Sequence, residues 1–237
     1  MDKLTITGIV DNYRCDTSYK RDWGFSALIR TKYNSILFDT GNNPEILENN
    51  LKIAAPDLSS IDYVFISHDD YDHTGGIEYI AKNYSVGKFI IPNLENKSLY
   101  NRITDCKKDV MEITSPTSFD MDIHSTGVMG DNKKEQSLII NTRLGNILIA
   151  GCSHMGAGTL ANYVKDAFTD DIYLFIGGYH FYKLYDDVLE EKIEEIIAAE
   201  PEFLAPTHCS GEQTREYIKN RYENKYFEFG AGKIFEI

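Results

Sequence analysis

Four apolar runs in this chain each end in a loop that carries a histidine. The runs cover residues 63–66, 146–150, 172–176 and 203–205, and the histidines that follow them are His68, His154, His180 and His208. Short apolar runs of this kind are typical of strands that are buried on both faces, as in parallel sheets. Open α/β folds bind their ligands at the carboxyl ends of such strands. The pattern therefore predicts an α/β protein whose functional side chains gather at strand ends.

Helical patterns alternate with the strand patterns. Helices are expected from Pro44 to about residue 56, over 158–168, and within the acidic stretch 186–200. A further helix is expected directly after Thr74, whose side chain we expect to cap its N-terminus. Further strands are expected at 4–10, 25–31, 35–38, 88–91 and 136–141, and the segments 226–229 and 233–235 are expected to form a closing hairpin. An antiparallel opening followed by alternating strands and helices predicts mixed sheets.

Charge and hydropathy exclude several classes of protein. The chain has 24 Lys and Arg against 37 Asp and Glu, a net charge of −13 that repels nucleic acid and anionic lipid surfaces. No run approaches the roughly 18 apolar residues of a membrane span, and the first residues lack the layout of a signal peptide. We therefore expect a cytoplasmic protein that acts on a small molecule, with no nucleic acid or membrane partner and with reduced cysteines.

The loop at residues 68–73 is the densest group of potential metal ligands. It holds His68, Asp69, Asp70, Asp72 and His73. Burying so many carboxylates without cations is too costly for a purely structural feature. Imidazole and carboxylate ligands suit zinc, iron or manganese, and the chain has no Cys-x-x-Cys pair of the kind that closes structural zinc sites. The loop therefore predicts an open, catalytic metal site.

These residues resemble the signature of the metallo-β-lactamase superfamily. Ser67-His68-x-Asp70-x-Asp72-His73-x-Gly75-Gly76 is similar to its S-H-x-H-x-D-H-x-G-G loop, and Phe38-Asp39-Thr40-Gly41 is similar to the strand end that precedes that loop. Later blocks resemble a subgroup of metal-dependent hydrolases that includes dihydropterin-ribofuranosylaminobenzene-phosphate synthase-like proteins. These blocks are Glu135-Gln136-Ser137-Leu138, Gly151-Cys152-Ser153-His154, Gly177-Gly178-x-His180 and Pro206-Thr207-His208-Cys209.

The resemblance implies a fold and a metal content. The fold is a four-layer αββα sandwich, in which mixed sheets carry helices on both outer faces. The whole chain, 1–237, would be a single domain whose two αββα halves meet at roughly 115–135. Two divalent metal ions, zinc, manganese or iron, would bind along one edge.

The resemblance also implies a ligand set with two departures from the usual pattern. His68 and Asp70 would hold the first metal, and Asp72, His73 and His208 the second. Asp70 stands where the superfamily normally has histidine, which favours manganese, iron or magnesium relative to the common form. Cys152 stands where many members have a bridging aspartate; Cys152 or His154 would replace it, and we favour His154. The usual middle histidine has no match, because His124 lies too early and is interpreted as a loop or surface residue.

Other side chains receive roles beside the metals. Asp72 is expected to orient the activated water, and His180 to donate a proton to the developing oxyanion or the leaving group. Asp39 is expected to hydrogen-bond a ligand histidine. Cys152 and Cys209 are interpreted as small buried side chains rather than as a redox pair.

The leading functional prediction is a metal-dependent hydrolase of a small ester, lactone or phosphoester, including pterin- or phosphoribosyl-related compounds. A di-iron redox enzyme is the first alternative, because the flavodiiron branch also has a carboxylate where Asp70 stands. A non-catalytic relative that binds a metal or a small molecule is the second. No sequence pattern indicates the oligomeric state.

Overall fold

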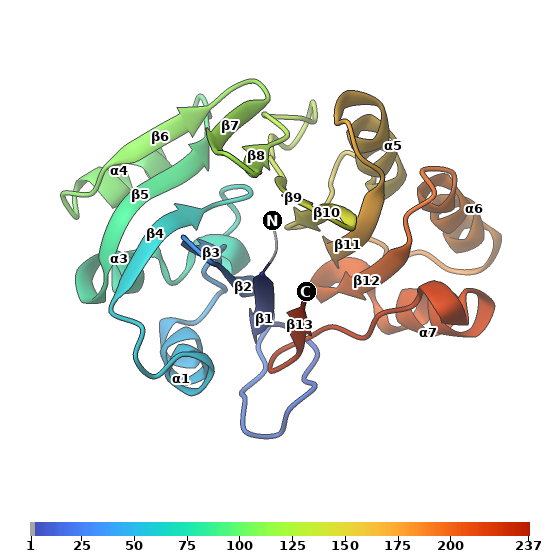
Figure 1. Ribbon diagram of the computed structural model, residues 1–237, viewed down its shortest axis with the longest axis horizontal. Helices are drawn as coiled ribbons and strands as arrows, with labels where there is room; N and C mark the ends of the chain where they lie inside the picture. Colours follow the sequence, from blue (N-terminus) through green and yellow to red (C-terminus); the bar gives the residue numbers. More distant parts are fainter. Residues whose placement is uncertain (1–2) are drawn as a thin grey trace. The chain divides into compact units, whose positions relative to one another are not determined.

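The computed structural model describes residues 3–237, and the chain divides into two compact units. Unit 1 comprises Met1–Ser115 and Gly230–Ile237, and unit 2 comprises Pro116–Phe229. Each unit has one mixed sheet with its own helices (Figure 1). The mixed sheets confirm what the strand and helix patterns predicted, whereas the single domain over 1–237 remains a prediction.

Unit 1 has a seven-stranded sheet in the order β13-β1-β2-β3-β4-β5-β6. Its strands are β1 (Leu4–Val10), β2 (Ser26–Thr31), β3 (Ser35–Phe38), β4 (Ser60–Phe65), β5 (Ser85–Pro92), β6 (Val110–Ile113) and β13 (Ile234–Glu236). Strands β13, β1, β2 and β3 pair antiparallel, whereas β3, β4, β5 and β6 pair parallel. The helices are α1 (Pro44–Ala54), α2 (Tyr71–Thr74), α3 (Ile77–Asn83) and α4 (Ser98–Thr104).

Helix α1 begins where the sequence predicts it. Pro44 occupies the first turn, and the side chain of Asn43 accepts a hydrogen bond from the backbone N–H of Glu45 at 2.9 Å. Its residues Leu47 and Leu51 are fully buried and join the core of unit 1. The apolar spacing therefore encodes both the helix and the face that it buries.

Unit 2 has a six-stranded sheet in the order β12-β11-β10-β9-β8-β7. Its strands are β7 (Thr117–Asp120), β8 (Ile123–Ser125), β9 (Leu138–Thr142), β10 (Gly145–Ala150), β11 (Ile172–Gly178) and β12 (Phe203–Thr207). Strands β10, β11 and β12 are parallel, and the others pair antiparallel. The helices are α5 (Ala157–Ala167), α6 (Asp186–Ile197), α7 (Glu212–Arg221) and the 3₁₀ turns η1 (His208–Ser210) and η2 (Glu223–Lys225).

Two local expectations were wrong. Thr74 does not cap a helix: it ends α2, and its hydroxyl donates to the carbonyl of Asp70 at 3.0 Å, while α3 begins after Gly76. Residues 226–229 do not form a hairpin strand. Strand β13 pairs instead with β1 in unit 1, because the tail crosses from one unit to the other between Phe229 and Gly230.

No helix within residues 3–237 combines the length and the apolar character that crossing a membrane requires.

Helix α6 allows a matched test of the unit 2 core. Ile193 is fully buried, whereas Val188 on the same helix is 52% exposed. We expect Ile193→Ala to lower the free energy of unfolding by about 2–5 kcal/mol because it leaves a cavity. Val188→Ala should change it by less than about 0.5 kcal/mol. Urea unfolding followed by circular dichroism measures both, and equal losses would contradict this packing.

Candidate metal centre

The ligand-rich segment of unit 1 follows β4 and folds into a loop and one turn of helix. His68 lies in the loop, and His73 lies in α2; both side chains are fully buried, with ring centroids 4.2 Å apart. Asp70 occupies the N-cap position of α2, but its carboxylate caps no backbone N–H. Its Oδ2 lies instead 3.2 Å from Nε2 of His68. The structure therefore brings the four predicted ligands of this segment, His68, Asp70, Asp72 and His73, into one small turn.

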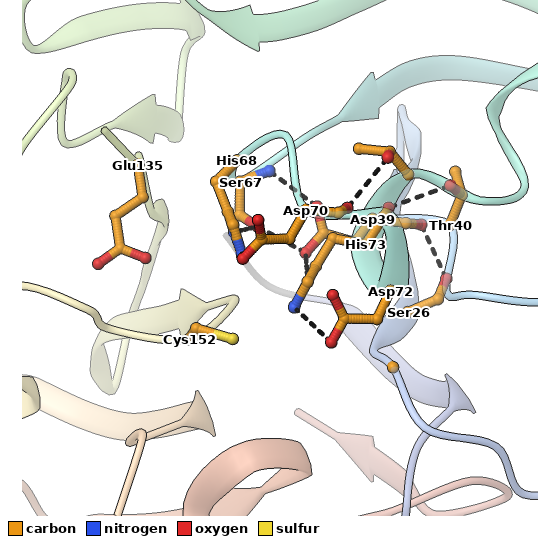
Figure 2. A network of polar contacts seen from close by, with 12 residues as sticks. Ser26, Asp39, Thr40, Ser67, His68, Asp70, Asp72, His73, Glu135 and Cys152 are labelled. Atoms are coloured by element: carbon orange, nitrogen blue, oxygen red, sulfur yellow. Dashed lines mark hydrogen bonds and ion pairs between the residues drawn. The ribbon is translucent and has the colours of Figure 1, made fainter. Parts of the chain in front are cut away.

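A single carboxylate sets the proton positions of both imidazoles (Figure 2). Asp39 Oδ2 accepts from the Ser67 hydroxyl and contacts Nδ1 of His73, both at 2.7 Å. Because the Ser67 proton goes to Asp39, Ser67 Oγ must accept from Nδ1 of His68, 2.8 Å away. Both rings therefore carry their proton on Nδ1. Their Nε2 atoms keep the lone pair that a metal ion requires.

The carboxylate of Asp39 that makes these contacts is fully buried. Burial raises the pKa of Asp39 above its usual value, and the contacts with His73 and Ser67 oppose that rise. The backbone N–H of Ser67 donates to its second oxygen at 2.7 Å. The predicted hydrogen bond between Asp39 and a candidate ligand histidine is thus confirmed.

The second carboxylate of the turn is held by a residue that sequence reasoning did not assign. Trp23 Nε1 donates to Asp72 Oδ2 at 2.8 Å, and the same oxygen lies 4.0 Å from Nε2 of His73. The backbone N–H of Phe25 donates to the carbonyl of Asp72. No sequence spacing indicates this contact, because 49 residues separate Trp23 from Asp72.

The donor set of this turn fits divalent metal ions. Each buried imidazole presents Nε2 to a carboxylate oxygen, in the pairs His68 with Asp70 and His73 with Asp72. Nitrogen and oxygen donors in this combination suit zinc, iron or manganese. The turn therefore offers two pairs of ligands.

In unit 2 the predicted histidines follow three neighbouring parallel strands. His154 follows β10, His180 follows β11 and His208 follows β12. The rings of His154 and His180 lie 4.6 Å apart between centroids. His208 is buried, whereas His180 is exposed. The three histidines thus lie at strand ends, as the sequence pattern predicts, and their functional role stays a prediction.

Glu135, which belongs to one of the blocks that resemble the hydrolase subgroup, is a functional candidate to which the sequence patterns gave no role. The residue is buried; its Oε2 contacts Nδ1 of His154 at 3.1 Å, and its Oε1 accepts from the backbone N–H of Met155 at 3.2 Å. The arrangement repeats that of Asp39 with His73, because the carboxylate holds Nδ1 and leaves Nε2 for a ligand. In the sequence, the signal for this role of Glu135 is an acidic residue shortly before the apolar strand β9.

A cavity of about 540 Å³ opens beside two of these histidines. Its lining includes His154, His180, Lys133 and Asp131, together with Thr159 in the first turn of α5. Polar and charged groups therefore face the space next to His180. His124 lies elsewhere, on β8, where its ring contacts Ser118 and Asn141.

The comparisons with known proteins identify the family. Residues 23–210 match the model of the metallo-beta-lactamase superfamily, so the chain belongs to this superfamily. The solved structure of Tm1679, a metal-dependent hydrolase of the beta-lactamase superfamily, is similar with a TM-score of 0.80 and 23% identity, and the match covers 99% of each chain. The predicted fold class is thus confirmed: two mixed sheets with helices form the metallo-β-lactamase α/β sandwich fold.

Two proteins of Methanocaldococcus jannaschii are similar over nearly their whole length. An uncharacterized protein is 28% identical over 262 residues, which cover 97% of this chain and 98% of that protein. The 7,8-dihydropterin-6-methyl-4-(beta-D-ribofuranosyl)-aminobenzene-5'-phosphate synthase is 23% identical over 287 residues, which cover 100% of this chain and 98% of the synthase. CmlA, a diiron beta-hydroxylase from Streptomyces venezuelae, is similar in fold, with a TM-score of 0.59 and 13% identity over 100% of this chain and 54% of CmlA.

Asp39→Asn tests the control of tautomers. The amide of asparagine can donate to Nδ1 of His73, which would move the ring proton to Nε2 and block metal binding. We expect metal affinity to fall about 10- to 100-fold, measured by competition with a coloured chelator. Asp57→Asn, an exposed site, is the matched control. Equal affinity in the two variants would contradict the role of Asp39.

Proposed function

We propose that this chain is a metal-dependent hydrolase, most simply a dinuclear one, that acts on a small ester, lactone or phosphoester. The observation that carries the proposal is the buried pair of imidazoles whose Nε2 atoms face Asp70 and Asp72. An arrangement in which a carboxylate network directs two histidines in this way is typical of metal ligands. Membership of a superfamily that consists mostly of enzymes also supports the proposal.

In this proposal six side chains hold two divalent ions. They are the ligands that the sequence resemblance implies: His68, Asp70, Asp72, His73, His154 and His208. The assignment of the last two rests on the sequence resemblance, and the contact of Glu135 with Nδ1 of His154 supports that of His154. Bound metals would lower the pKa of a water molecule to near neutrality and neutralise charge on the attacked group.

The chain's own residues would do the remaining work. Asp72, oriented by Trp23, would accept a hydrogen bond from the attacking water and so direct its lone pair toward the substrate. His180 would donate a proton to the leaving group, because its ring is exposed and lines the cavity beside His154. Lys133 and Asp131 in the same cavity offer charges of opposite sign, which favours a strongly polar substrate.

The substrate is proposed as a class. A cavity of about 540 Å³ falls within the range of about 300–1,000 Å³ that is usual for small-molecule sites. The similarity to the dihydropterin phosphate synthase keeps pterin- and phosphoribosyl-related compounds among the substrates to be tested. We also propose that the protein works in the cytoplasm and needs no nucleic acid or membrane partner, in keeping with its net charge of −13.

One observation favours a second candidate, a di-iron redox enzyme. Asp70 gives the first pair of ligands a carboxylate, and carboxylate-rich sites suit iron. Oxygen consumption that requires bound iron, without hydrolysis of any ester, would favour this candidate over the hydrolase.

Metal content tests the ligand set. Protein purified without added metal or chelator is expected to contain about two divalent ions per chain, measured by inductively coupled plasma mass spectrometry. His68→Ala and His208→Ala should each lower this number, and Asp70→His should keep it. His124→Ala is the control, because His124 is engaged with Ser118 and Asn141. No metal in any preparation, including after remetallation, would favour a non-catalytic relative.

His180→Ala tests the proton donor. Once a screen of esters, lactones and phosphoesters has found a substrate, kcat is expected to fall at least about 100-fold, with unchanged metal content. The loss should be smaller for a substrate with a better leaving group, since such a group needs no proton. Unchanged turnover of both substrates would remove His180 from the mechanism.

A further inference from the structure

Two buried cysteines of unit 2 lie beside each other although 57 residues separate them. The Sγ atoms of Cys152 and Cys209 and a ring nitrogen of His180 all lie within 4.8 Å of one another. The thiol of Cys209 also donates to the carbonyl of Cys152 at 3.8 Å. Neither cysteine is part of a disulfide, and their side chains are 4% and 1% exposed.

The geometry of the sheet explains how the two thiols meet. Strand β11 separates β10 from β12, so side chains on those outer strands are about 10 Å apart. Cys152 lies two residues beyond the end of β10, and Cys209 lies two residues beyond the end of β12. There both segments turn toward the end of β11, where the backbone N–H of Gly178 donates to the carbonyl of Gly151 at 3.1 Å.

Gly178 provides the space in which the thiols approach. A Cβ atom at this position would lie 2.5 Å from Sγ of Cys209 and 3.2 Å from Cα of Cys152. Any side chain here would therefore displace Sγ of Cys209 and the backbone of the segment that holds Cys152. A glycine at the end of β11 is what makes the pair possible.

The sequence favours Cys152 and Cys209 as small buried side chains, but their proximity in the structure supports a different role. We propose that the two cysteines are a modification site, at which hydrogen peroxide oxidises them to a reversible intramolecular disulfide. One thiol sulfur attacks the O–O bond of hydrogen peroxide and becomes a sulfenic acid, while the displaced hydroxide takes the proton of that thiol and leaves as water. The sulfur of the second thiol then attacks this sulfur and an S–S bond forms, while the sulfenic hydroxide takes the second thiol's proton and leaves as another water. Two thiols are oxidised by two electrons, and one peroxide is reduced.

Disulfide formation would affect the segments that follow two strands, β10 and β12. Cys152 precedes His154 by two residues, and Cys209 directly follows His208. Closing the sulfur atoms to the S–S bond length of about 2.05 Å requires at least one of the two turns to shift. The inference itself needs no metal and no hydrolytic activity, so it stands or fails independently of the proposed function.

The experiment is a peptide map of the full-length wild-type protein. Reduced protein, as purified and after chelator treatment, is exposed to hydrogen peroxide, blocked with an alkylating reagent and digested without reduction. We expect a cross-linked pair of peptides that contains Cys152 and Cys209, an intact mass lower by about 2 Da before blocking, and reversal by dithiothreitol. Cys15, which is exposed, and Cys106, which is half-buried, serve as internal controls and should be alkylated as monothiols.

Variants separate this pair from general oxidation. Cys152→Ser and Cys209→Ser should each abolish the cross-link, and a double variant Cys15→Ser with Cys106→Ser should keep it. Circular dichroism checks that each variant is folded. The proposal is overturned if neither wild-type preparation yields the Cys152–Cys209 peptide, or if sulfinic acid forms on these cysteines in place of the disulfide.

Discussion

The buried carboxylate of Asp39 organises the ligand turn of unit 1. It accepts hydrogen bonds from the hydroxyl and the backbone N–H of Ser67 and contacts Nδ1 of His73. Through Ser67 the same carboxylate also determines the tautomer of His68. A charge in so apolar a place is unfavourable unless several donors satisfy it, and here the donors are the groups that must be oriented. The same contacts therefore stabilise the buried charge of Asp39 and orient the imidazoles of His68 and His73.

Backbone strain marks the strand ends that bear the candidate site. Four residues have φ angles between 48° and 58°, a backbone region that residues other than glycine rarely adopt. These residues are Asp39, Ser153, His180 and His208. They follow β3, β10, β11 and β12, respectively. Such strain persists only where surrounding contacts enforce it, and it gathers at functional sites. Lys107, Asp186 and Glu200 share this φ region away from these strand ends, so the strain supports the candidate site without defining it.

Local patterns predicted the parts of the fold that depend on local physics. The apolar spacing and Pro44 predicted α1, because neighbours in sequence decide where this helix begins and which face it buries. The segment at residues 68–73 was predicted as a loop, and part of it forms the short helix α2. The contact of Trp23 with Asp72 and that of Glu135 with His154 depend on how distant segments pack, which no spacing records. The partner of β13 was missed for the same reason, since a strand pattern shows that a strand exists and not which edge it joins.

The pairing of β13 with β1 makes unit 1 discontinuous in sequence. Residues 230–237 complete a sheet whose other strands lie before residue 116, and all of unit 2 lies between them. During synthesis, unit 2 can therefore gather every one of its own strands before unit 1 receives its last edge strand. Until then β1 presents an open sheet edge, and such edges pair readily with other chains. Once paired, β13 becomes the edge in place of β1, and an edge strand of 3 residues offers fewer unpaired backbone groups to another chain than one of 7 residues.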